Sequence, residues 1–515
     1  MKKLPIGVQT FKKMRENDFV YVDKTELIHA LTENGSNYFL SRPRRFGKSL
    51  LVETFKELFL GNEKLFQGLW IHDKWDWSKT YPVIHLSFDA MDYQNMGLDG
   101  AIGAEMNKLS KHFGIVLTEQ TYKAKFQELI EAVSKKHGKV VLLVDEYDKP
   151  IIEYLESSDL PEARKNQKIM KTFYSVLKTA EEHLRFFFIT GVSKFSRVSI
   201  FSDLNYLTDL TIHPDFTTIV GYTQQELEFY FDEHLQAVQK KLNMDRETLL
   251  EEVRLWYNGY SWDGINKLYN PFGILNFFDQ KWLLNFWFTT GMPSFLVKIM
   301  REKLVFDVEN SRINIIKLDK YDIENLDLVP LLFQTGYLTV KSIDPSTREM
   351  VLDYPNNEVR ESMYSYMIDS FAGNEHRPDA SITNKDLLKA FIDADLDQIK
   401  RLINSLLAGL PEEAYRKTAE GLFHGLIHFV FQLLGMYIKS EVHSSHGRAD
   451  SVVETATHVF IFKFKFNRRA EQAMQQIKDN KYADKYRADN KTIIGIGVNF
   501  VSKDKEINGW ETEVL

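Results

Sequence analysis

Gly47, Lys48 and Ser49, in the stretch SRPRRFGKSL, have the types and the order of residues that hold the phosphates of a nucleotide. In a phosphate-binding loop, glycine lets the backbone wrap the phosphate, lysine reaches the outer phosphates and serine holds the metal ion. The stretch follows the apolar segment YFL and opens a segment with helical periodicity, as such a loop requires. Arg42 occupies the position of the first glycine in the usual pattern GxxxxGK(S/T). Taken alone, the stretch has an alternative interpretation, which is a basic loop that caps a helix.

A second stretch, KVVLLVDEYDKP, is an apolar strand that ends in two adjacent acids, Asp145 and Glu146. In an ATP-hydrolysing site the first of these carboxylates would hold the magnesium shell, and the second would polarise the attacking water. Taken singly, a strand that ends in a solvated acidic turn is the plain alternative. Together with the GKS sequence, the stretch predicts that the protein binds ATP and Mg²⁺ and hydrolyses the nucleotide.

The stretch RFFFITGVSKFSRVSI supplies a further buried strand and two weaker candidates. Thr190, at the end of this strand, is placed to sense the outer phosphate through a hydrogen bond. The assignment is softer, because any strand end carries a polar residue. Arg197 is a candidate finger contributed to a neighbouring subunit, which would require a homo-oligomer, although a lone arginine is more often a surface charge.

The elements that must position these residues follow from the hydrophobic pattern. Short apolar runs alternate with helical periodicity from Tyr38 to Gly221, which indicates an α/β sheet domain. Farther on the helical period dominates, and a second unit with long helices and several strands follows. We therefore expect a core over 1–220, a helical unit over 221–345, a connector over 346–380 and a second α/β unit over 381–515. The expected strands of the core are YFLS, PVIHLSF, KVVLLVD and RFFFITG.

Composition limits the remaining classes of protein. The chain has 515 residues, 44% of them hydrophobic, a net charge of −7 and no cysteine. Disulfides and thiolate metal sites are excluded, and contact with nucleic acid must rest on local basic clusters rather than on global charge. The start MKKLPIGVQTFKKM has no apolar region behind its lysines, and WLLNFWFTTGMPSFLV is too short and too polar to span a bilayer. We expect a cytoplasmic protein with no membrane contact.

Several further stretches are shared with a known family. The stretches that carry the resemblance are RPRRFGKSL, YVDKTELI, VDEYDKP, TGVSKFS, FSDLNYLTDLT, WYNGYSWDG, LLFQTGYL and YPNNEVR. Together they resemble the AAA-ATPase-like proteins of bacteria and archaea that carry a PD-(D/E)XK nuclease-like domain at the C-terminus. The resemblance implies a P-loop core, a helical ATPase lid after Gly221 and an α/β restriction-endonuclease-like domain. It also implies that an arginine-rich loop replaces the usual start of the motif, so that nucleotide binds at Arg42, Arg44, Arg45, Phe46, Gly47, Lys48 and Ser49.

The same resemblance implies a second metal site in the C-terminal domain. In such domains two or three carboxylates bind Mg²⁺, and a lysine orients or activates the water that attacks the phosphodiester. Asp450 in GRAD matches the first acid, Lys465 in FKF the lysine, and Glu420 in KTAEGLFHGLIHF the glutamate of a preceding helix. Gln476 and Tyr482 match the helix that follows, which in this family often contacts nucleic acid or supports the site.

The middle acid of that site is missing. In VFIFKFKFN the side chains alternate between faces, which places Lys463 beside Lys465 where the family has glutamate. A single extra charge at about 4 Å is worth about 4 kcal/mol at an effective dielectric of about 20, so the change weakens a divalent-ion site severely. Glu454 lies about 13 Å along the strand from Asp450, too far to share one ion. Glu441 is the remaining candidate for a relocated acid.

We therefore expect an ATPase that acts on nucleic acid through a nuclease-like domain that binds it with little cleavage. Lys463, Lys465, Arg468 and Arg469 favour phosphate, while Lys463 opposes metal. One alternative is a regulatory switch or assembly protein controlled by nucleotide, and another is an active magnesium-dependent nuclease with a relocated carboxylate. A zinc site at the paired histidines is a lesser alternative, because such pairs are more often packing residues: His424, His428, His443 and His446. The sequence does not separate DNA from RNA.

Overall fold

The protein forms two compact units in the computed structural model. The first comprises Met1–Phe295 and Val308–Glu358, and the second comprises Leu296–Asp307 and Val359–Leu515. The residues that the structure describes are 1–155, 159–194, 207–287, 296, 299–300, 308–319, 327–372, 380–407, 430, 451–487, 491–501 and 506–515.

A parallel five-stranded sheet, in the order β2-β3-β4-β1-β5, forms the centre of the first unit. Its third strand along the chain, VVLLVD, is buried at every position, as expected of a parallel strand covered on both faces. The expected strands YFLS, PVIHLSF, KVVLLVD and RFFFITG are confirmed. The bounds are β1 Asn37–Ser41, β2 Val83–Ser87, β3 Val140–Asp145, β4 Leu184–Gly191 and β5 Thr208–Asp209.

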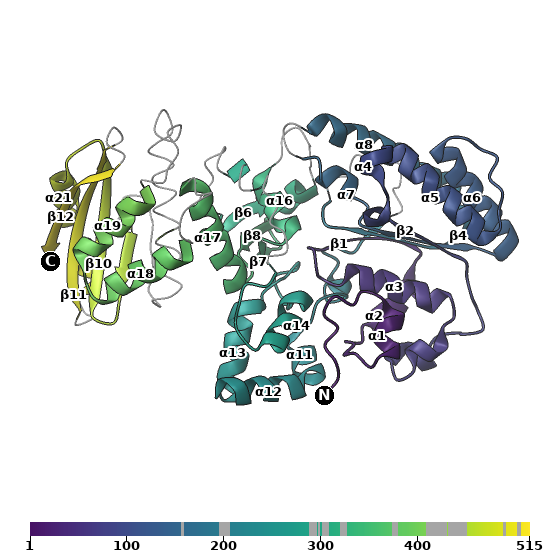
Figure 1. Cartoon of the computed structure of the whole chain (residues 1–515), viewed down its shortest axis with the longest axis horizontal. Coiled ribbons are helices and arrows are strands. Elements are labelled where there is room, and N and C mark those ends of the chain that lie inside the picture. The colour runs from purple at the N-terminus through teal and green to yellow at the C-terminus, as the bar shows by residue number, and fades with distance from the viewer. Residues whose placement is uncertain are drawn as a thin grey trace. The chain divides into compact units, whose positions relative to one another are not determined.

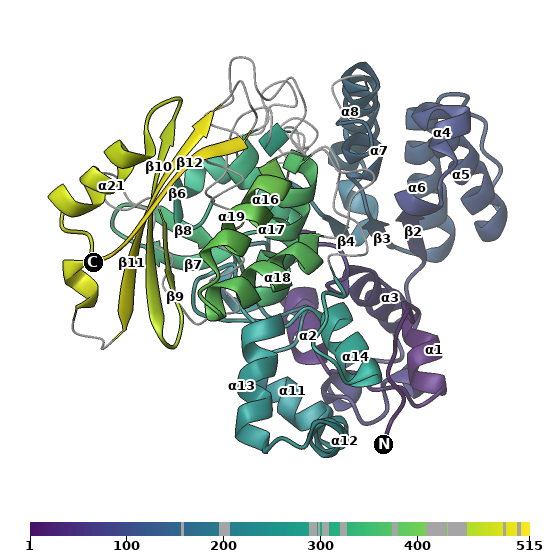
Figure 2. The same ribbon diagram turned by 60° about the vertical axis from the view of Figure 1, so that its left-hand side comes forward.

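Helices cover both faces of this sheet (Figures 1 and 2). On one face lies α3, which begins directly after the phosphate-loop sequence and buries Val52, Phe55 and Leu58. It lies together with α1 and α2, and the opposite face carries α5, α6 and α8 with short helices between them. The bounds are α1 Phe11–Glu16, α2 Thr25–Asn34, α3 Lys48–Phe59, α4 Tyr93–Met96, α5 Leu98–Phe113, α6 Tyr122–His137, α7 Lys149–Ile152, α8 Leu160–Tyr174 and α9 Val176–Thr179.

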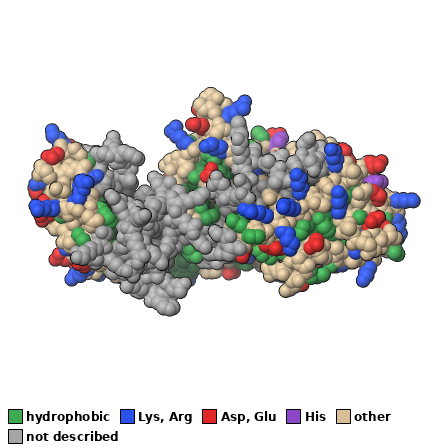
Figure 3. Space-filling model, turned by 90° about the horizontal axis from the view of Figure 1, so that it is seen from above, with side chains coloured by type: hydrophobic (Ala, Val, Ile, Leu, Met, Phe, Trp, Pro, Cys, Tyr) green, Lys and Arg blue, Asp and Glu red, His purple; other side chains and the backbone are tan. Residues whose placement is uncertain are grey.

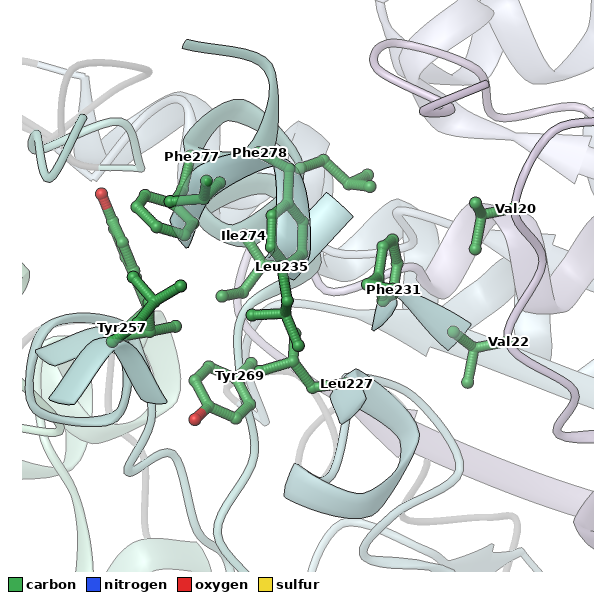
Figure 4. Close-up of a cluster of buried hydrophobic side chains, with 14 residues drawn as sticks. Val20, Val22, Leu227, Phe231, Leu235, Tyr257, Tyr269, Ile274, Phe277 and Phe278 are labelled. Carbon is green, nitrogen blue, oxygen red and sulfur yellow. The ribbon is translucent and has the colours of Figure 1, made fainter. Parts of the chain in front are cut away.

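A helical subdomain, which we call the lid helices, follows the sheet in the chain. It comprises α11 Gln224–Tyr230, α12 Asp232–Leu242, α13 Arg246–Tyr257 and α14 Pro271–Gln280. A capping box of Thr223 and Glu226 starts α11, and the Asn270 side chain caps α14. The lid helices share a hydrophobic cluster with Val20 and Val22 of the N-terminal segment, which face Phe231 in Figure 4. The N-terminal segment therefore packs against the lid helices.

A small antiparallel sheet of order β6-β8-β7 completes the first unit. Its strands are β6 Ser311–Asn314, β7 Thr339–Asp344 and β8 Glu349–Asp353, with α16 Leu328–Thr335 before β7. β6 and β7 lie within the segment 221–345, where we expect a helical unit, and β8 lies within 346–380, the expected connector. β8 is the central strand: it pairs with β7, which precedes it across a short turn, and with β6, which lies earlier in the chain, before α16.

A mixed four-stranded sheet of order β12-β11-β10-β9 forms the second unit. β10 and β11 are parallel, and the outer pairings are antiparallel. Helix α21 follows β10 and packs on one face, where Gly497 lets the helix backbone approach: a Cβ there would lie 2.6 Å from the Ala470 carbonyl. The bounds are β9 Ser451–Glu454, β10 His458–Phe466, α21 Ala470–Asp479, β11 Thr492–Val501 and β12 Glu506–Val514.

The two faces of β10 pack as the alternation predicts. Val459 and Ile461 join a cluster with the α21 residues Met474 and Ile477. On the other face, the ring of Phe460 lies 5.1 Å from that of Phe391 in α18. The chain enters this unit through three helices, α17 Asn357–Ala372, α18 Ala380–Ile392 and α19 Leu396–Leu407.

Candidate functional site

The phosphate-loop sequence connects β1 to α3 through two residues with left-handed backbone angles. Arg45 has φ 66° and Gly47 has φ 94°. For arginine this conformation is uncommon and costs free energy, and such residues cluster at functional sites. Gly47 is the N-cap of α3, and its carbonyl accepts the N–H of Leu51 at 3.0 Å. The loop therefore directs the first turn of α3, with Lys48 and Ser49, toward the carboxyl end of the sheet.

The Lys48 ammonium is buried inside this loop. It donates to the carbonyls of Arg42 and Pro43, each at 2.9 Å, and its residue is 6% exposed. Burial lowers the pKa of Lys48, and the nearby carboxylates of Asp145, Glu146 and Asp148 oppose that shift. A cation surrounded by acids at the start of a helix is suited to hold phosphate and a metal ion together.

Arg42 and Phe46 anchor the loop instead of lining the site. The Arg42 guanidinium is fully buried, donates to the carbonyls of Ser41 and Thr211, and lies 4.0 Å from the Trp262 ring centroid. Phe46 is also fully buried, and its ring lies 5.3 Å from that of Trp262. This placement goes against the expectation that these two side chains bind nucleotide. Burial lowers the pKa of Arg42 to about 9.

The strand β3 ends with the two expected acids beside the loop. Asp145 is 5% exposed, and its Oδ1 accepts the N–H of Glu146 at 3.0 Å. Glu146 itself has φ 52°, a strained conformation for a residue with a side chain. Burial, and then the charge of Asp145, raises the pKa of Glu146 above its ordinary value, which Lys48 partly opposes. A carboxylate in this setting is a better proton acceptor than a solvated one.

Thr190 does not reach the site. It is fully buried at the end of β4, and its hydroxyl donates to the Leu40 carbonyl of β1 at 2.7 Å. The expected role as a phosphate sensor is therefore not supported by its position. Asp148 connects β4 to the site instead, since its carboxylate accepts the backbone N–H groups of Val192 and Ser193. The candidate finger Arg197 lies outside the described residues.

A cavity of about 430 Å³ lies beside the phosphate loop. The charged part of its lining, which we call the charged end, comprises Arg44, Arg45, Gly47, Lys48, Ser49, Asp89, Glu146, Asp148, Lys149 and Glu153. The largely apolar part, which we call the apolar end, comprises the N-terminal residues 5–9, Met14, Tyr222, Pro271, Phe272 and Leu275. The Arg45 guanidinium, from the charged part, lies 5.2 Å from the ring centroid of Phe272, from the apolar part. A lining of both kinds suits a nucleotide, which has a charged half and an apolar half.

The sequence did not predict the residues of the apolar end, or all of those of the charged end. The N-terminal residues 5–9 and the first turn of α14 approach the loop only in the folded chain. Asp89 follows β2 and forms an ion pair with Lys149. Because the carboxyl ends of parallel strands meet at one edge, the end of PVIHLSF was the available signal for Asp89.

Two side chains, one in the charged end and one directly beside it in the chain, are of the types that hold a magnesium ion. Ser49 supplies a hydroxyl at the start of α3, and Asp145 supplies a carboxylate at the end of β3. Mg²⁺ in phosphate sites takes one or two protein ligands and completes its shell with phosphate and water. Among the described residues, no group of three or more His, Cys, Asp or Glu side chains is arranged to hold a metal ion.

The C-terminal sheet brings together two of the residues expected there. The Lys465 ammonium donates to Gln476 Oε1 on α21 at 2.7 Å. Lys463 lies on the same face of β10, opposite Gly497 of β11, and is half-buried. Glu454 forms an ion pair with Lys491 and lies opposite Val459 in the sheet. The other candidates lie outside the described residues: Asp450, Glu420, Glu441, His424, His428, His443 and His446.

Comparisons with known proteins match both domains. A family model described as a predicted AAA-ATPase matches residues 5–201, and a model of the PD-(D/E)XK nuclease superfamily matches residues 418–510. A protein of Azotobacter chroococcum mcd 1, titled "Uncharacterized protein in vnfD 5'region", is 38% identical over 537 residues, covering 100% of this chain and 99% of the relative. The chain belongs to the AAA-ATPase-like proteins with a PD-(D/E)XK nuclease-like domain. The resemblance found in the sequence is confirmed.

The expected fold class is also confirmed by the parallel sheet of this AAA-ATPase-like protein and by its family match. Among solved structures, the Orc1 protein of Aeropyrum pernix in complex with DNA matches 66% of this chain and 90% of its own, with 10% identity and a TM-score of 0.24. At that TM-score the match carries no argument about function. Within the described part of the chain, no helix is long and apolar enough to cross a membrane.

Proposed function

We propose that the protein binds ATP with Mg²⁺ in the cavity beside Lys48 and hydrolyses it, and that its C-terminal domain binds nucleic acid with little cleavage. The observation that carries the first part is the common cavity of Gly47, Lys48, Ser49 and Glu146. These residues come from two distant stretches, and each type suits its place around a terminal phosphate.

Several side chains in and beside the charged end have distinct roles in this proposal. The loop N–H groups and Lys48 hold the phosphates, and Arg44 and Arg45 add positive charge beside them. Ser49 and Asp145 hold the metal, which neutralises charge on the outer phosphates when bound. Glu146, whose pKa is raised by burial, takes a proton from the attacking water. At the apolar end, Phe272 and Tyr222 pack against the base.

The second part of the proposal rests on the basic segment 463–469. Lys463 and Lys465 lie on one face of β10, and Arg468 and Arg469 are exposed between β10 and α21. On the face drawn in Figure 3, basic and acidic side chains of the described residues are interspersed. A local cluster of this kind binds phosphate groups with an affinity that falls as salt rises. Lys463 stands where a carboxylate would bind the metal that cleavage needs.

Replacing Glu146 by glutamine tests the hydrolysis step. The amide keeps the shape of the side chain but accepts a proton far less readily, so we expect phosphate release to fall by about 10²- to 10⁴-fold while ATP binding is retained. Phosphate release and ATP affinity are measured on the same full-length preparation. Glu153→Gln is the matched control, because Glu153 lines the same cavity but its carboxylate accepts the Tyr93 hydroxyl at 2.6 Å. Turnover of Glu146→Gln at the wild-type rate would remove Glu146 from the mechanism.

A further inference from the structure

Three stretches that the nucleotide site leaves without a role pack around the base of the phosphate loop. They are WYNGYSWDG, LLFQTGYL and YPNNEVR. Glycines mark their close approaches: a Cβ on Gly259 would lie 1.9 Å from the Pro355 carbonyl oxygen, and a Cβ on Gly336 would lie 2.7 Å from the Pro43 ring. The Ser261 N–H donates to the Thr339 hydroxyl at 2.6 Å. The stretches therefore form one packed support beneath the loop.

Trp287 connects this support to the loop backbone. Its indole Nε1–H donates to the Arg44 carbonyl at 3.1 Å, and the residue is 5% exposed. The Trp287 ring lies 6.1 Å from that of Tyr260, and the Tyr260 ring lies 5.0 Å from that of Phe46. The indole thus holds the loop at Arg44 directly, and through Tyr260 it packs against the side chain that anchors the loop.

Glu358 holds Trp287 in turn. Its carboxylate is fully buried, and Oε1 accepts the Trp287 backbone N–H at 2.5 Å. Within the described residues Oε2 has no hydrogen-bond partner, and a Cβ on Gly273 would lie 3.3 Å from it. Gly273 belongs to the first turn of α14, whose neighbours Pro271 and Phe272 line the cavity. Burial raises the pKa of Glu358 to about 8. The Glu358 carboxylate therefore binds Trp287, which contacts the phosphate loop, and lies close to the first turn of α14, which lines the cavity.

Glu358 is the last residue of the first unit. Glu358 is in the first turn of α17, and the rest of that helix, from Val359, belongs to the second unit. On the loop side, a phosphate bound at Lys48 competes for the ammonium with the carbonyls of Arg42 and Pro43, the two residues before Arg44. A change in the loop backbone at Arg44 would alter the hydrogen bond from Trp287, whose backbone N–H is bound by Glu358 at the start of α17.

We infer that Trp287 and Glu358 are positioning residues that connect the phosphate loop to α17, so that nucleotide in the cavity changes the order of the helix leading to the nuclease-like domain. This inference rests on the proposed function, because it requires nucleotide to bind at Lys48. It names the route by which that binding reaches the second unit: the Arg44 carbonyl, the Trp287 indole and backbone, and the Glu358 carboxylate.

Hydrogen exchange of the full-length protein tests the inference, with the magnesium complex of adenylyl-imidodiphosphate as the probe. In the wild type we expect the nucleotide to slow exchange in peptides of the phosphate loop and of α17, the latter by about two- to tenfold, the range of one net hydrogen bond. Trp287→Phe keeps the ring but lacks the indole N–H, so it should keep the response of the loop and lose that of α17. Glu358→Ala should do the same, and Glu358→Gln, which keeps an acceptor oxygen, should restore the response.

Two control variants share the chemistry of these changes but not their position. Trp75→Phe alters an indole that packs on Phe59, and Glu57→Gln alters a buried acid bonded to Asn62. Both should keep the α17 response. Protection of the loop without a response in wild-type α17, or a response that survives in Trp287→Phe, would overturn the inference while leaving ATP binding intact. An absence of protection anywhere in the wild type would overturn ATP binding itself, and the inference with it.

Discussion

Replacing Lys48 by alanine is expected to abolish ATP turnover in the purified full-length protein. The Lys48 ammonium is buried, and the carboxylates of Asp145, Glu146 and Asp148 act against the lowering of its pKa by burial. Without it, these three acids lie near the phosphates with one cation fewer to offset their charge where transition-state charge develops. Loss of one such donor in other enzymes costs about 10²- to 10³-fold in rate, and the added repulsion makes the loss larger here. Phosphate release measured at saturating ATP reports the effect.

Lys56→Ala is the matched control for this change. Lys56 lies in the last turn of the same helix, α3, where it forms an ion pair with Glu53 at 3.1 Å. We expect this variant to turn over ATP at nearly the wild-type rate, because a half-exposed pair of this kind contributes little. Thermal unfolding of both variants shows whether either loss arises from misfolding. Unchanged turnover in a folded Lys48→Ala protein would rule out the ATPase assignment.

Replacing Lys463 by glutamate is expected to give the C-terminal domain magnesium-dependent nuclease activity that the wild type lacks. Lys463 and Lys465 lie on one face of β10, and Gln476 already holds the Lys465 ammonium at 2.7 Å. The substitution changes the local charge by two units, and each unit is worth about 4 kcal/mol at about 4 Å and an effective dielectric of about 20. Cleavage of labelled DNA and RNA, with and without ATP and Mg²⁺, measures the gain.

Two further variants separate the supply of a carboxylate from the loss of a lysine. Lys463→Gln removes the charge without adding a metal ligand, so it should not cut. Lys463→Glu combined with Lys465→Ala supplies the ligand but removes the lysine that orients water, so it should lose the gained activity. Equal cleavage by the wild type and by Lys463→Glu would mean that the metal-binding acid lies elsewhere in the chain and that the domain is not degenerate.

The residues that carry local chemistry were predictable because their patterns are short. A glycine, lysine and serine after an apolar strand, and two acids at the end of another, are set by neighbours in the chain, and the structure brings Lys48, Glu146 and Ser49 to one cavity. The faces of β10 were predictable for the same reason, since alternation is a property of the strand itself.

The residues whose roles depend on distant partners were not predictable. Arg42 has the charge of a phosphate ligand, and only the folded chain shows that Trp262 lies against its guanidinium. Thr190 stands at a strand end, but its hydroxyl is turned to the Leu40 carbonyl of the next strand in the sheet. The apolar end of the cavity is formed largely by residues 5–9 and α14, and neither segment carries a motif of its own. Each of these depends on tertiary packing, which short patterns do not encode.

The most direct test of the central claim, that ATP occupies the cavity beside Lys48, is photolabelling with 8-azido-ATP followed by peptide mapping. The apolar end of the cavity, which would hold the base, is lined by residues 5–9, Met14, Tyr222 and the first turn of α14. We predict that the label lies in peptides from these segments and that it disappears with excess ATP and in Lys48→Ala. Label confined to other segments, or unaffected by excess ATP, would contradict the claim.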